Sequence, residues 1–218
     1  MAVLLLRLAA PLQAWGSSSK FIVRSTEREP TKSGVIGMIA AALAIQRNDD
    51  PQKLVPLTTL RFGVRADKEG VLLKDFHTVQ VPGEKHPEVS YRYYLSDAVF
   101  LVALESDDKL LLESIASALQ KPVYPLYLGR KSCPPTLPIV LGVKDEDILT
   151  ALKTEPYLYK NAHRKSVRIS YEVTSGGAMV QDIPLSFSQL HRKHGWRMKR
   201  EELLDVDSNP EHDAFSEL

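Results

Sequence analysis

The chain has 218 residues, of which 44% are hydrophobic and 25% are charged, a composition typical of a globular protein with its own core. Its single cysteine, Cys133, excludes an internal disulfide and a cysteine-rich zinc site, and we expect it to be a packing residue without chemistry. The apolar stretches at residues 3–6 and 35–45 are too short to span a bilayer, and no basic segment precedes the first. We therefore expect a soluble cytoplasmic protein with no metal, no cofactor and no membrane contact.

Charge is unevenly distributed along the chain, although the net charge is only +1. Residues 205–218 carry five acids and neither lysine nor arginine, and we expect them to form a flexible acidic tail. Taking those five acids out of the net charge of +1 leaves +6 on residues 1–204. No acid occurs between residues 114 and 144, where Lys121, Arg130, Lys131 and Lys144 lie. A basic body with concentrated basic loops is consistent with a polyanionic partner.

Hydrophobic patterns predict an α+β fold. In chain order they indicate a strand at 3–9, a long connection at 10–30, a helix at 33–46, a strand hairpin at 60–66 and 71–73, an irregular polar stretch at 75–94, a strand at 97–105, a helix at 109–120 and a strand at 123–128. This order approximates the βαββαβ unit of a ferredoxin-like domain whose middle hairpin carries an insertion. Further strands are expected at 138–142, 165–173 and 178–183.

The same patterns suggest how the chain is divided. We expect a ferredoxin-like domain at residues 1–142 with an insertion at about 75–94, a small β-rich part at 143–204, and the acidic tail at 205–218.

Pro30 and the residues after it predict the start of a helix. Thr31 and Ser33 are favourable N-cap residues, and the apolar run behind them favours a buried helix. A helix N-terminus with Lys32 beside it is suited to a phosphate group, and Gly34 allows another backbone to approach closely. The order of residues differs from that of a Walker A loop, in which lysine and serine follow the glycine. An ordinary capped core helix is the alternative interpretation.

Four segments of the sequence, in the same order along the chain, resemble the CasD family of subunits from the type I-E CRISPR surveillance complex Cascade. They are residues 6–16, 30–47, 75–78 and 127–134. The resemblance extends to about residue 142 and is weak beyond it. It implies a RAMP-type fold, a modified ferredoxin-like (RRM-type) domain in which the inserted β-hairpin forms a thumb. It also implies a non-catalytic subunit that binds the 5′ handle of the guide crRNA and caps the backbone filament in antiviral defence.

The resemblance implies protein partners as well. They are the backbone subunit CasC and the large subunit CasA, with CasB and the guide-producing subunit CasE as further candidates. Target DNA would be reached only indirectly, through the assembled complex.

The resemblance and the residue types together give a set of expected RNA contacts. By segment, these are Gln13 and Trp15; Arg24 and Arg28; Thr31, Lys32, Ser33 and Gly34; His77 and Arg92; and Tyr127, Gly129, Arg130, Lys131 and Ser132. Basic side chains and N–H groups would bind phosphates, while Trp15 and Gln13 would stack on or read an unpaired base. For Trp15 a buried position against the core is the alternative, and for the arginines of the second segment it is surface ion pairing with Glu27 or Glu29. For the basic run at 191–197 we expect contact with RNA or with a neighbouring subunit. A solvated edge strand is the alternative.

Two enzyme classes are alternatives to a binding subunit. Type I-C relatives of the family cleave precursor crRNA without metal, and His77 with Tyr91 or Tyr93 and Lys85 is the set that could do so here. The second alternative is a nucleotide-binding enzyme that uses the Lys-Ser pairs at 32–33 and 131–132. Neither pair has the Walker A spacing.

Overall fold

The computed structural model of the chain describes residues 1–16, 23–80, 82–83, 86–159, 165–188 and 190–205. Its body is a seven-stranded sheet in the order β10-β11-β9-β4-β7-β1-β8, and all neighbouring strands are antiparallel. The strands are β1 (Ala2–Ala9), β4 (Arg61–Lys68), β7 (Val99–Ser106), β8 (Val140–Lys144), β9 (Ser166–Val173), β10 (Ala178–Ser186) and β11 (Lys193–Asp205). This mixed architecture with a large antiparallel sheet confirms the expected α+β class.

Helices cover both faces of this sheet. On one face, α1 (Lys32–Ala42) and α3 (Lys109–Gln120) pack against Leu4 and Leu6 of β1, and on the other α4 (Ile148–Thr154) packs against Val3 and Leu5. All four β1 side chains are fully buried. Because successive residues of a strand point to opposite faces, a strand covered on both sides has an unbroken apolar sequence, as β1 does.

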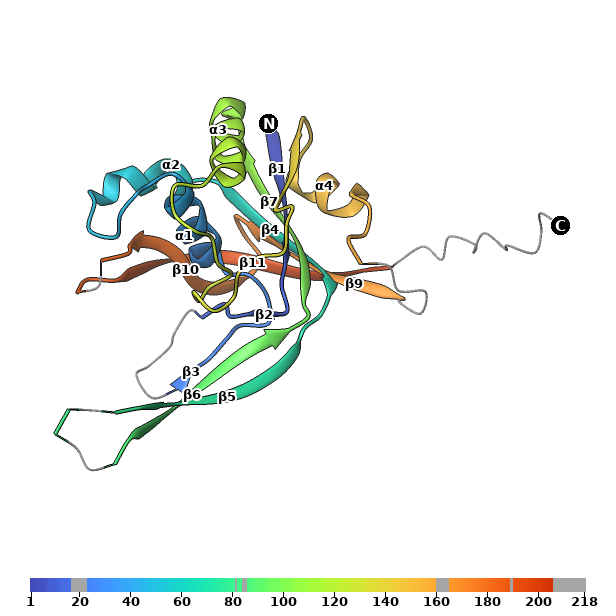
Figure 1. Cartoon of the computed structure of the whole chain (residues 1–218). Coiled ribbons are helices and arrows are strands. Elements are labelled where there is room, and N and C mark those ends of the chain that lie inside the picture. Colours follow the sequence, from blue (N-terminus) through green and yellow to red (C-terminus); the bar gives the residue numbers. More distant parts are fainter. Residues whose placement is uncertain (17–22, 81, 84–85, 160–164, 189, 206–218) are drawn as a thin grey trace.

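A long hairpin projects away from this body (Figure 1). Its strands β5 (Val71–Val79) and β6 (Glu88–Ser96) pair in continuous antiparallel register, and the short strands β2 (Leu12–Gln13) and β3 (Val23–Arg24) pair with β6. The expectation of an irregular stretch at 75–94 was therefore wrong for most of its length. Most of β5 is exposed on both faces, so its sequence lacks the apolar alternation from which a strand is predicted.

Two other expected elements differ from the structure. Helix α1 ends at Ala42 instead of residue 46, and Ala44 adopts a positive φ of 63° just beyond it. Residues 123–128 form no strand. Pro122 and Pro125 flank and interrupt that stretch, and proline supplies no N–H to a ladder. The place beside β1 is taken by β8, close to the strand expected at 138–142.

The C-terminal strands continue the main sheet. Strand β9 pairs with β4, β11 pairs with β9, and β10 completes that edge. The expected boundary at residue 142 falls inside β8, and of the expected tail only Asp205 lies within the described residues. The 3-10 helix η1 (Pro51–Leu54) and the one-turn helix α2 (Val55–Thr58) follow α1 and were not expected. No helix in the described ranges combines the length and apolar character that a bilayer crossing requires.

Candidate nucleic-acid interface

Carboxylates from the C-terminal strands β9 and β10 accept hydrogen bonds from the first residue of α1. Thr31 is the N-cap, and its hydroxyl accepts from the Gly34 N–H at 3.2 Å. The Lys32 N–H donates to Asp182 Oδ2 at 2.9 Å, and the Lys32 ammonium donates to Glu172 Oε2 at 2.9 Å. The Lys32 residue is 1% exposed, and burial lowers its pKa despite the charge of Glu172. A phosphate could therefore reach this ammonium only by displacing Glu172, contrary to the expected direct contact.

The segment before α1 is fixed to the same strands by Glu29. The Glu29 carboxylate accepts from Lys199 and from Ser170, each at 2.8 Å, and forms an ion pair with Arg168. Burial raises the pKa of Glu29, but the charges of Lys199 and Arg168 together with these hydrogen bonds outweigh it and hold the pKa below its ordinary value. Residues 29–32 thus rest on a platform formed by β9, β10 and β11.

Trp15 and Gln13 lie in the core. Trp15 is 1% exposed and its indole N–H donates to Gln13 Oε1 at 3.0 Å. The Gln13 amide donates in turn to the Ala98 carbonyl at 2.8 Å. The alternative of a buried tryptophan is therefore the observed one, and an RNA base has no access to either side chain without rearrangement.

Two glycines allow distant loops to meet around residues 14 and 15. A Cβ atom on Gly34 would lie 2.8 Å from Cε3 of Trp15. Gly129 has a φ of +86°, and a Cβ atom there would lie 1.6 Å from the Ala14 carbonyl oxygen. The Ala14 N–H also donates to the Leu128 carbonyl at 3.1 Å. The segment after Pro30 and the Gly129 loop therefore both pack against residues 14 and 15, the first at the Trp15 ring and the second at the Ala14 backbone, as a shared binding surface requires.

Three of the expected RNA-contacting arginines lie on one face of the hairpin. Arg24 of β3 and Asp75 of β5 are the direct partners of Arg92 of β6, so all three side chains leave the small sheet on the same side. Arg130 lies over the ring of Tyr94 at 4.6 Å, and its guanidinium donates to the Arg24 carbonyl at 2.8 Å. We call Arg24, Arg92 and Arg130 the arginine face.

Buried nitrogen atoms in the arginine face have no partner in the described chain. They are Arg92 Nε and Arg130 Nη1. Lys131 and Ser132 are exposed in the turn next to Arg130, while Tyr127 is half-buried with its carbonyl bonded to the Gly129 N–H. Arg28 is exposed and lies 3.9 Å from Glu69, a long ion pair of the surface type that was the stated alternative.

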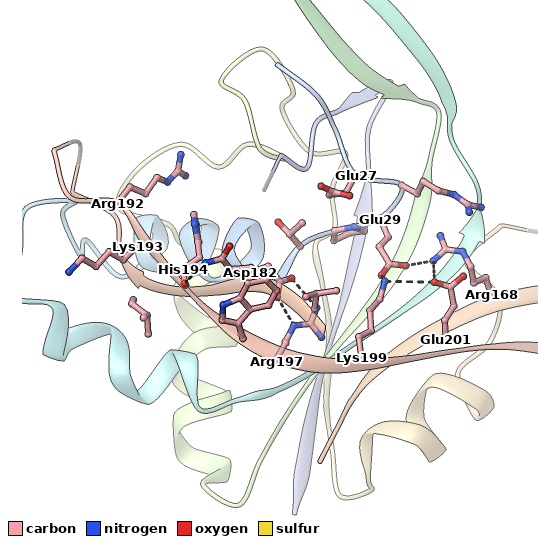
Figure 2. Close-up of a pocket in the computed structure, with 17 residues that line it drawn as sticks. Glu27, Glu29, Arg168, Asp182, Arg192, Lys193, His194, Arg197, Lys199 and Glu201 are labelled. Atoms are coloured by element: carbon pink, nitrogen blue, oxygen red, sulfur yellow. Dashed lines mark hydrogen bonds and ion pairs between the residues drawn. The ribbon is translucent and has the colours of Figure 1, made fainter. Parts of the chain in front are cut away.

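A cavity of about 690 Å³ lies between residues 27–31 and strands β10 and β11, and many charged side chains line it. Figure 2 shows Glu29, Arg168, Lys199 and Glu201 at one end, the Asp182–Arg197 pair between, and Arg192, Lys193 and His194 at the other end. The basic run at 191–197 thus enters β11, paired with β10, and part of it lines the cavity. No local pattern of residues indicates this cavity, because its walls come from segments about 150 residues apart.

The chain matches a family model over residues 3–199, and the family is described as CRISPR-associated protein (Cas_Cas5). The chain belongs to the Cas5 family. It is 40% identical to the CRISPR system Cascade subunit CasD of Escherichia coli (strain K12) over 157 residues, which are 64% of this chain and 70% of that protein.

Two solved structures resemble this Cas5 protein over nearly their whole length. One is described as the crystal structure of a Cas protein, with a TM-score of 0.76 and 40% identity, covering 93% of this chain and 95% of the other. The second is described as a CRISPR RNA-guided surveillance complex, with a TM-score of 0.78 and 33% identity, covering 94% and 90%.

The residues of the expected nuclease set are not assembled in this Cas5 protein. His77 pairs across the hairpin with Ser90, whereas Tyr91 pairs with Phe76 and Tyr93 with Lys74. Because residues directly opposite one another share a face, both tyrosines lie on the side of the hairpin away from His77. His77 Nε2 instead lies 3.1 Å from Asp75 Oδ2. Lys85 lies outside the described residues, and among those described no group of three His, Cys, Asp or Glu side chains could hold a metal ion.

Proposed function

We propose that this Cas5 protein is the Cascade subunit that binds the 5′ handle of the crRNA and caps the backbone filament, without cleaving RNA itself. The observation that carries the proposal is the arginine face, in which side chains from three distant segments meet with buried nitrogen atoms left unpaired. Such donors are costly unless a ligand accepts from them, and phosphate oxygens are suitable acceptors. The 40% identity to a Cascade subunit supports the same assignment.

The order of the strands and helices supports a ferredoxin-like core with an inserted thumb. The strands β8, β1, β7 and β4 are adjacent in that order, and the chain sequence β1, α1, β4, β7, α3, β8 is that of a βαββαβ unit. We interpret this unit as the ferredoxin-like RAMP core and the β5–β6 hairpin, inserted between β4 and β7, as the thumb. Partners in this arrangement are CasC and CasA, with CasB and CasE as further candidates.

A salt titration of RNA binding tests the function. The wild-type chain is titrated with a fluorescent single-stranded RNA that carries the repeat-derived handle, at several salt concentrations. Each phosphate contact contributes about −0.7 to the slope of log K against log salt for single strands. Arg24→Ala removes an exposed side chain that makes no ion pair in the described chain, so we expect weaker binding and a slope shallower by about 0.7, with unchanged thermal stability.

Lys153→Ala is the matched control. It removes the same charge from an exposed position on α4, which covers the opposite face of the main sheet, and it should leave the slope unchanged. Equal slopes for wild type, Arg24→Ala and Lys153→Ala would contradict the arginine face as the binding surface. Incubation with full-length repeat RNA tests the absence of catalysis: cleavage that is lost in His77→Ala would contradict a purely binding role.

A further inference from the structure

The cavity between residues 27–31 and strands β10 and β11 is distinct from the arginine face, but one continuous segment links the two. Arg24 and Ser25 accept from Arg130 through their carbonyls, and Arg28 is among the residues that line the cavity. A strand of RNA held at the arginine face would therefore lead along residues 24–31 to the mouth of the cavity. Its volume of about 690 Å³ is in the range of pockets that enclose a small organic ligand.

Charge is neutralised at one end of the cavity and left unbalanced at the other. Arg168 and Lys199 are paired with Glu29, and Arg197 makes a two-pronged pair with Asp182 at 2.6 and 2.9 Å. At the opposite end, neither Arg192 nor Lys193 forms an ion pair within the described chain (Figure 2).

The environment of Arg192 adds to this imbalance. The Arg192 side chain is exposed, and local desolvation together with the charge of Arg47 lowers its pKa. The positive charge of Arg47 repels that of Arg192, and an anion bound beside Arg192 would relieve that repulsion. This end of the cavity therefore favours a phosphate group.

Two buried nitrogen atoms lie on residues beside this basic end, and the guanidinium of one of them, Arg197, lies 5.1 Å from the ring centre of Phe62. His194 Nε2 and Arg197 Nη1 are buried and have no hydrogen-bond partner in the described chain, and Arg197 is only 6% exposed. Burial and the charge of Arg192 lower the pKa of His194, so its ring is neutral near pH 7 and offers one donor and one acceptor nitrogen. Unpaired buried groups of this kind are rare in native structures and call for a ligand or an ordered water.

An aromatic platform completes the set. Trp196 lines the cavity, is 57% exposed, and stands opposite Gln181 of the neighbouring strand. A solvent-exposed indole beside basic side chains is the arrangement on which unpaired bases stack in single-stranded nucleic-acid binding.

We propose that this cavity receives one unstacked nucleotide of the bound RNA, with its base on Trp196 and its phosphate held by Arg192 and Lys193. This assignment rests on the proposed function and adds a second contact region to the arginine face. A protein side chain from a neighbouring subunit is the competing occupant. RNA is favoured because the cavity combines unpaired basic and hydrogen-bonding groups with a lining segment, residues 27–31, that follows directly on Arg24 of the arginine face.

The experiment combines a Trp196 variant with an RNA that lacks single bases. Full-length wild-type and Trp196→Ala chains are titrated with the handle RNA and with a series in which each nucleotide in turn is made abasic. Loss of one base–indole stack weakens binding on the order of 10-fold. We expect this loss in Trp196→Ala with intact RNA, and in the wild type with one particular abasic RNA. Combining the two should cause little further loss, because both remove the same contact.

Two variants control for the position and the chemistry of Trp196. Trp196→Phe keeps a stacking surface and should restore most of the affinity. Leu203→Ala removes an exposed apolar side chain from the same strand, at a residue 70% exposed and outside the cavity, and should bind as the wild type does. Tryptophan emission gives an independent readout: Trp15 is 1% exposed and Trp196 57%, so RNA-induced quenching should vanish in Trp196→Phe.

The outcomes separate this proposal from the proposed function. If Trp196→Ala binds every RNA as the wild type does, the cavity assignment is wrong and the arginine face stands. If Trp196→Ala binds RNA normally but no longer assembles with the other subunits, the occupant is a protein and the assignment is again wrong. If the wild type fails to bind handle RNA at any salt concentration, the proposed function fails, and the cavity assignment fails with it.

Discussion

Replacement of Lys32 by methionine tests whether this lysine stabilises the fold or binds RNA. Methionine fills a similar volume but removes the ammonium that donates to Glu172 at 2.9 Å. Breaking a fully buried ion pair from one side costs about 3–5 kcal/mol. The Lys32 side chain is 1% exposed but that of Glu172 is 21% exposed, so water solvates part of the remaining carboxylate. We therefore expect a loss of about 1–3 kcal/mol, which lowers the melting temperature by about 2–4 °C for each kcal/mol in a chain of this size.

The assays are thermal or urea unfolding and the salt dependence of RNA binding. Lys32→Met should be less stable than the wild type, with the salt slope unchanged, because the ammonium faces Glu172 and not solvent. Glu172→Gln breaks the same pair from the other side. The double variant should lose less stability than the two single variants together, since both remove one interaction.

The dependence of stability on pH in the alkaline range gives a second test of the role of Lys32. Burial lowers the pKa of Lys32 in the folded chain below its ordinary value of 10.5, so the folded state releases this proton first. Stability from this group therefore rises with pH through the alkaline range up to about 10.5, and Lys32→Met should lack that rise. A variant as stable as the wild type, with a salt slope reduced by one phosphate contact, would refute the structural role.

Three further predictions follow from contacts in the described chain. Gly129→Ala should lower the free energy of unfolding by about 2–4 kcal/mol, measured by urea unfolding, because its Cβ would lie 1.6 Å from the Ala14 carbonyl oxygen at a φ of +86°. Gly83→Ala is the control. Gly83 also has a positive φ but no atom within 4 Å of the added Cβ, so this change should cost only about 1–2 kcal/mol. Glu29→Gln should weaken the fold at neutral pH. The lowered pKa of Glu29 adds stability above its ordinary value of 4.5, and this stability is lost as the pH falls through the folded pKa, so the urea midpoints of wild type and variant should converge as the pH falls below 4.5. Convergence at high pH instead would contradict this sign. Trp15→Phe should cost about 1–3 kcal/mol, because it leaves Gln13 Oε1 buried without its donor, and it should leave the salt slope of RNA binding unaltered; a changed slope would restore Trp15 as an RNA contact.

Elements with strong local signals were predictable. Helix α3 has the expected bounds of 109–120, with Asp108 as its N-cap and an apolar face of Leu112, Ile115 and Leu119. Strand β1 was found from its apolar run. Both depend on periodicity and capping, which operate within a few residues.

The site was only partly predictable, because the partner of a charged residue is not visible locally. Lys32 and Arg24 look equally suited to phosphate in the sequence, yet Lys32 meets a carboxylate 140 residues away and Arg24 remains exposed. Arg92 was expected to contact RNA, but only strand register shows that it faces the same side as Arg24 and away from Tyr91. The cavity at β11 required the pairing of β10 with β11, which no local pattern reported.

The platform under residues 29–32 has a consequence for how the protein is made. Glu29 and the first turn of α1 are secured by Glu172, Asp182 and Lys199, which leave the ribosome after most of the chain has been synthesised. In a nascent chain Lys32 and Glu29 therefore lack their partners until the last strands have been synthesised. Contacts between residues so far apart in sequence also form slowly. Ribosome-bound chains stopped before residue 170 should be cut readily by protease near Pro30, whereas the full-length chain released from the ribosome should be protected there.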